Sequence, residues 1–152
     1  MIPEFRKLTD PEAELMFRAP VLVCILIAGA DGRIDNKEIR QAIAFVSSKK
    51  TNPVLEQFFA LLAEDFEDKI KITIQSFPYE STQRTPLLLE ELSHVNHLLK
   101  KVPTDFGLAF YDMLRSLAEK VAASSGGIFG INSITAEESK YIRLPMIEKP
   151  AP

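Results

Sequence analysis

Apolar residues recur along the chain at spacings of three and four, which is the pattern of amphipathic helices. The spacing predicts helices that begin near Asp35, Asn52, Thr85 and Thr104, and a last short helix over residues 135–144. Each beginning carries a side chain typical of a helix N-cap, in two cases directly before proline. The sequence therefore predicts an all-α fold, a single compact bundle of about six to eight helices.

The first predicted helix has Asp10 as its N-cap, Pro11 at its first helical position and Glu12 in its first turn. We expect Pro20 to kink or restart this helix, because proline cannot donate the backbone hydrogen bond of an interior position. The most hydrophobic segment, Ala19–Ala30, follows directly. A helix that spans a bilayer needs roughly 17–25 apolar residues, so this shorter segment predicts a buried core helix.

One segment fits two kinds of structure. Residues 69–74 alternate polar and apolar positions as a strand would, but Phe66, Ile70, Ile74 and Phe77 also have helical spacing. A lone strand would have no partner in this chain, and an unpaired edge is unfavourable. We therefore interpret the segment as helix.

The most informative motif is the turn between the first two helices, residues 30–39 (ADGRIDNKEI). Gly32 permits the positive φ with which a helix commonly ends. Asp35 and Glu38 have the spacing of a capping box, and Ile34 and Ile39 occupy the positions of a hydrophobic staple. These features predict a tight corner between two helices.

A second corner of similar pattern is expected about a hundred residues later. An apolar helix ends in Ser124–Gly127, and Ile134, Thr135 and Glu138 repeat the spacing of Ile34, Asp35 and Glu38. This corner is longer by the insertion 128–133. Two like corners indicate a duplicated helical arrangement around one core.

The first corner also matches the second half of an EF-hand calcium loop, from Asp31 to Glu38. In that register Ile27 and Gly29 would occupy the first and third ligand positions, and neither has a side-chain oxygen. The sequence therefore excludes a true EF-hand.

The two corners together resemble those of the TerB-like (tellurite-resistance) family of helical domains. They are also similar to the related N-terminal domain of some membrane-associated J-domain co-chaperones. The resemblance covers roughly residues 11–144, and it leaves residues 1–10 as a leader and residues 145–152 as a flexible tail. It implies a bundle with an acidic cluster near the two turns and a role in stress response.

The resemblance also implies a site for a divalent cation. Asp31 and Glu38 match the family's first acidic pair, and Glu138 matches its later glutamate, whereas Ser125 or Gly126 stands at the family's second aspartate. With Asp35, the candidate ligands of a weakly bound Mg²⁺ or Ca²⁺ are Asp31, Asp35, Glu38 and Glu138. Capping and turn formation are the alternative role of these acids.

Two further groups have chemistry to consider. Glu90, His94 and His97 share one face of a predicted helix, which indicates a solvated face with a Glu–His pair or, alternatively, a metal site. Cys24 lies within the most hydrophobic segment, so we expect a small buried side chain, not a reactive thiol.

Composition and charge limit the function. The chain has 18 Lys and Arg against 21 Asp and Glu, a formal charge of −3, which gives no general reason to bind nucleic acid. It has one cysteine, which suits a reducing compartment, and no secretory signal is apparent at the N-terminus, so we expect a cytoplasmic protein. No nucleotide-binding or hydrolase motif is present.

We therefore expect a non-enzymatic helical module that binds a partner protein. The apolar residues Ile128, Phe129 and Ile131, in a glycine-rich connection, are the candidate docking residues. The alternative is a module that binds a small apolar ligand or a lipid in a cavity between helices. The sequence leaves the oligomeric state open.

Overall fold

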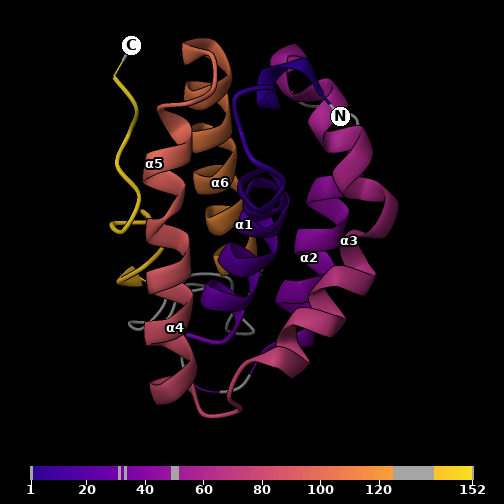
Figure 1. Cartoon of the computed structure of the whole chain (residues 1–152). Helices are drawn as coiled ribbons and strands as arrows, with labels where there is room; N and C mark the ends of the chain where they lie inside the picture. The colour runs from indigo at the N-terminus through magenta and orange to yellow at the C-terminus, as the bar shows by residue number, and fades with distance from the viewer. Residues whose placement is uncertain (1, 31, 33, 49–51, 125–138, 152) are drawn as a thin grey trace.

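The computed structural model describes residues 2–30, 32, 34–48, 52–124 and 139–151, and within these ranges it is all-helical (Figure 1). In chain order the elements are the 3-10 helix η1 (Pro3–Phe5), α1 (Asp10–Ala28), α2 (Asn36–Ser47), the 3-10 helix η2 (Pro53–Leu55), α3 (Glu56–Ser76), α4 (Ser81–Ser93), α5 (Val95–Leu99) and α6 (Thr104–Ser124). The all-α prediction is confirmed for these ranges. The predicted second corner falls on residues 125–138, outside the described residues.

Helix α1 is the central element of the bundle. It packs against α2, α3, α4, α5 and α6, and Figure 1 shows α2 and α3 on one side of it and α4 and α5 on the other. Every residue from Ala19 to Ala28 is buried. The hydrophobic segment is thus a core helix, and no helix in the described ranges combines the length and apolar character that a bilayer crossing requires.

Helix α1 begins one residue earlier than the sequence predicts. Thr9, not Asp10, is the N-cap: its hydroxyl accepts a hydrogen bond from the backbone N–H of Glu12, and the Glu12 carboxylate accepts one from Thr9. This reciprocal pair is a capping box. Asp10 lies in the first turn, where the helix dipole stabilises its negative charge.

Two prolines lie inside helices that were expected to begin or restart there. Helix α1 continues through Pro20, which is buried, so packing on all sides of α1 offsets the hydrogen bond that the proline cannot donate. Helix α4 begins at Ser81, not at Thr85, and includes Pro86. Arg84 holds the first turn of α4. Its backbone N–H donates to the carbonyl of Glu80, and its side chain donates to the carbonyl of Tyr79.

Other predictions about individual helices are confirmed. Residues 69–74 are part of α3, so the ambiguous segment is helix and not strand. Asp35 caps α2, and the Asn52 side chain accepts a hydrogen bond from Val54 at the beginning of η2.

Residues near both ends of the described chain, within the expected leader and beside or within the expected flexible tail, pack against the bundle. Ile2 and Phe5 are buried at one end of the chain, and Leu144 and Ile147 are buried at the other. The Asn96 amide donates to the carbonyl of Met146 and accepts from the N–H of Glu148. Periodicity does not show these contacts, because they are made by single apolar residues outside the α-helices.

The core contains a cluster of phenylalanine rings centred on Phe58. Its ring lies 4.8–6.2 Å, centroid to centroid, from five others: Phe5, Phe17, Phe59, Phe106 and Phe110. These rings come from η1, α1, α3 and α6, so one side chain joins elements from both ends of the chain.

Replacement of Phe58 by alanine tests this role. We expect Phe58→Ala to lower the free energy of unfolding by about 3–5 kcal/mol, because the fully buried ring leaves a cavity among its neighbours. Urea denaturation followed by circular dichroism measures the change. Ile72→Ala is the control, since Ile72 on the same helix is 68% exposed and should cost little. Equal losses in the two variants would contradict the central position of Phe58.

Candidate functional site

The structure describes part of the acidic corner that the sequence predicts as a cation site. Asp31 and Glu138 lie outside the described residues. The Asp35 carboxylate accepts a hydrogen bond of 2.7 Å from the backbone N–H of Lys37 and so caps α2. The predicted capping box with Glu38 is wrong, because the N–H of Asp35 donates to the carbonyl of Ala28.

Glu38 is buried, with 2% of its surface exposed. It lies close enough to Cys24 for its charge to add to the effect of burial, and together these raise the pKa of the Cys24 thiol far above its usual range. The prediction that Cys24 is a buried core residue is confirmed, since it is 0% exposed.

The corner itself is held by a buried cation, the guanidinium of Arg84 in α4. Its Nη2 donates to the carbonyls of Gly29 (2.9 Å) and Gly32 (2.8 Å), and its Nη1 donates to the carbonyl of Tyr79 (2.6 Å). Arg84 is 2% exposed, and burial lowers its pKa. Because arginine stays charged in proteins, the site holds a permanent positive charge.

This arrangement bears directly on metal binding. A hard cation at this corner would use carbonyl and carboxylate oxygens, and the carbonyls of Gly29 and Gly32 already accept hydrogen bonds from Arg84. Within the described ranges, no three His, Cys, Asp or Glu side chains converge closely enough to hold a metal ion. A cation site that includes Asp31 and Glu138 stays a prediction of the sequence.

Two glycines shape the corner for different reasons. Gly32 has a φ of +127°, which confirms the predicted positive φ. Gly29 is the C-cap of α1 with an ordinary φ, but a Cβ at this position would lie 2.5 Å from Nη2 of Arg84. Gly29 is therefore required by the close approach of the guanidinium.

The predicted histidine face is exposed and lies beside a groove. His94 and His97 are both exposed, on either side of the junction between α4 and α5. His94 lines a groove of about 470 Å³ between α1, the end of α3 and α4. The remaining lining residues are Arg18, Ser76, Phe77, Leu87, Glu90 and Glu91.

An ion pair fixes one wall of this groove. The guanidinium of Arg18 donates from Nε and Nη2 to the two carboxylate oxygens of Glu91. The same guanidinium lies 5.8 Å from the centroid of the Phe77 ring, a cation–π contact. Bidentate pairing restricts both side chains, so Phe77 is held against a fixed charge.

The sequence did not identify Arg84 or the groove, and it placed partner binding at Ile128, Phe129 and Ile131, which lie outside the described residues. Arg84 carries no local signal, because its three acceptors are backbone carbonyls in two distant segments. Glu90 and His94 did draw attention at the sequence level, and they do line one cavity.

The described fold is that of a helical bundle protein with a central hydrophobic helix. The chain is similar to the uncharacterized protein ORF11' of Methanothermobacter thermautotrophicus, with 33% identity over 132 residues that cover 82% of each chain. The chain belongs to the same family as that protein. No family model matches the chain, and no solved structure matches it.

Removal of the Arg84 side-chain charge tests its role at the corner. We expect Arg84→Met to lower the free energy of unfolding by about 3 kcal/mol, because buried carbonyls lose their charged donor. Arg40→Met is the matched control, since Arg40 is exposed on α2. Urea denaturation of both variants measures the difference, and no loss in Arg84→Met would contradict the anchoring role.

The reactivity of Cys24 provides a second test. A thiol that is buried and has a raised pKa stays protonated and shielded, so we expect its reaction with a chromogenic thiol reagent at pH 8 to be slower in the native protein than in urea by on the order of a hundredfold. The Cys24→Ser variant gives the background rate. Equal rates in the native and unfolded states would show that the thiol is accessible.

Proposed function

We propose that this protein is a non-enzymatic helical module that binds a partner protein, and that the groove between α1, α3 and α4 is the docking site. The occupant we propose is a short segment of the partner with one large apolar side chain next to a lysine or arginine. The observation that carries the proposal is the pairing of an apolar floor with an acidic rim in one preformed groove.

The floor of the groove is apolar and accessible. Leu87 is 44% exposed, which is unusual for a leucine in a bundle whose other α4 leucines are buried or half-buried. Phe77 lies beside it, half-buried. Exposed apolar side chains that gather on one surface are typical of protein interaction sites.

The rim supplies the charge preference. Glu90 is exposed and makes no ion pair within the described residues, whereas Glu91 is occupied by Arg18. Glu90 is therefore available to a basic side chain of the partner. The Arg18–Glu91 pair keeps Phe77 in place before binding, which lowers the ordering cost of association.

The role in stress response rests on the resemblance of the sequence to TerB-like domains alone. The alternative, a binder of an apolar ligand or lipid, has less support, because even the most apolar of four pockets among the described residues, which Phe45, Leu55 and Phe59 line in part, also contains the charged Asp112. We therefore place protein binding first.

A library of randomised peptides displayed on phage tests the docking site. We expect selection on the folded protein to enrich peptides with a large apolar residue next to a basic one. Leu87→Glu should weaken the binding of a selected peptide by about tenfold or more, because it places a charge on the apolar floor. Fluorescence anisotropy with the labelled peptide measures the affinity.

Leu61→Glu is the matched control, because Leu61 is 39% exposed and lies about four turns before Phe77 in α3. It should leave the affinity unchanged, and Glu90→Lys should reverse the preference for basic peptides. Failure to enrich any such peptide, or equal loss in the two glutamate variants, would overturn the proposal.

A further inference from the structure

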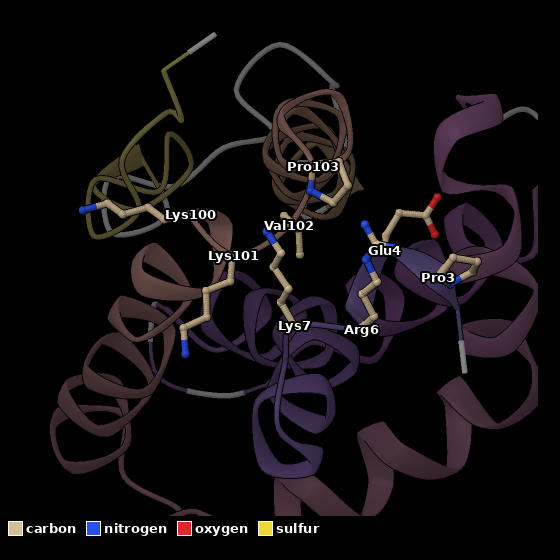
Figure 2. Close-up of a pocket in the computed structure, with 8 residues that line it drawn as sticks. All are labelled: Pro3, Glu4, Arg6, Lys7, Lys100, Lys101, Val102 and Pro103. Atoms are coloured by element: carbon tan, nitrogen blue, oxygen red, sulfur yellow. The ribbon is translucent and has the colours of Figure 1, made fainter.

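A second cavity differs from the docking groove because its lining is rich in positive charge. It has a volume of about 350 Å³ and lies between the N-terminal segment and the turn that leads into α6. Its lining residues are Pro3, Glu4, Arg6, Lys7, Lys100, Lys101, Val102 and Pro103 (Figure 2). Four of these eight are cations and one is an acid, in a chain whose formal charge is −3.

Three of the four cations form no ion pair with another described residue. These three, Arg6, Lys7 and Lys100, are exposed. Lys101 differs, because its Nζ lies 2.7 Å from the Glu12 carboxylate, and this hydrogen bond lowers the pKa of Glu12. Within the described part of the chain, the cavity therefore holds positive charges that no carboxylate pairs with.

The side chains of Arg6 and Lys7 form the centre of the cavity. Figure 2 shows both extending from the N-terminal segment toward the turn at Val102 and Pro103, whereas the ends of Lys100 and Lys101 point away from them. The backbone that carries them is anchored to the core, since the preceding residue Phe5 is buried among the phenylalanine rings. Two adjacent cations are thus presented on an anchored segment.

The beginning of a long helix lies beside this cavity. Helix α6 begins at Thr104, directly after the lining residue Pro103, and is 21 residues long. The beginning of a helix carries a partial positive charge, but here the carboxylate of Asp105 lies in the first turn and accepts a hydrogen bond from the N–H of Phe106. The charge that the cavity offers to an anion is therefore that of the Arg6 guanidinium and the Lys7 ammonium group.

We infer that this cavity binds a small anion of the oligophosphate class, with Arg6 and Lys7 as the ligands. A guanidinium binds phosphate oxygens in a bidentate manner, and a neighbouring ammonium adds a point charge. The lining contains no aromatic ring on which a nucleobase could stack, so the phosphates themselves are the recognised group. The volume is at the lower end of the range for small-ligand sites.

Inorganic pyrophosphate is the probe that tests this inference. Titration of the ¹⁵N-labelled protein at low ionic strength should give saturable shifts of the amide signals of residues 4–7, 100–102 and 104. Orthophosphate and sulfate at equal ionic strength should bind more weakly, because they span fewer cations. Shifts spread evenly over the surface, or no saturation, would overturn the inference.

Two double variants that remove the same charge distinguish binding at this cavity from nonspecific electrostatic attraction of the anion to the protein. We expect Arg6→Ala combined with Lys7→Ala to weaken pyrophosphate binding by about tenfold or more, measured by calorimetry. Lys37→Ala combined with Arg40→Ala removes the same charge from exposed positions on α2 and should have little effect. Equal losses would show that only the net charge matters. Should the first pair fail to fold, the amide shifts of the wild type still decide the question.

Discussion

The interaction on which the arrangement of the helices depends is the set of hydrogen bonds from Arg84 to three backbone carbonyls. One guanidinium binds Gly29 at the end of α1, Gly32 in the corner and Tyr79 before α4. Three chain segments therefore meet at a single buried charge. Such a charge is unfavourable to bury unless its donors are bonded, so the position of α4 relative to the corner is strongly determined. The same bonds position two lining residues of the proposed docking groove, because Phe77 lies two residues before Tyr79 and Leu87 lies one turn after Arg84.

The helical character of the chain was predictable, because it depends on apolar spacing that each segment carries by itself. The correct assignment of residues 69–74 to α3 shows this. The predictions that were wrong depended on context. Pro20 and Pro86 look like helix breaks in the sequence, but burial of the first and the anchoring of Arg84 near the second keep both helices continuous. Residues 145–152 were expected to be flexible, because one buried residue such as Ile147 produces no periodic signal.

The sites were less predictable than the fold, for a physical reason. The Asp35 cap is local and was identified, whereas the groove joins residues from three helices and becomes visible only in space. His94 and Glu90 were noticed for their spacing, but the groove that they line also contains Phe77 and Arg18, which lie in other segments of the chain. The same holds for the basic cavity, where Arg6 and Lys7 meet a turn about ninety-five residues away.

The contact between Gly29 and Arg84 has an evolutionary consequence. A Cβ at position 29 would lie 2.5 Å from Nη2 of Arg84, so a larger residue there requires the guanidinium to move, whereas glycine is compatible with any residue at position 84. In a homologue with a larger residue at position 29, we expect the arginine to be displaced or replaced by another donor to the corner. Covariation between these two columns, separated by more than fifty positions, would be the trace of that constraint in an alignment.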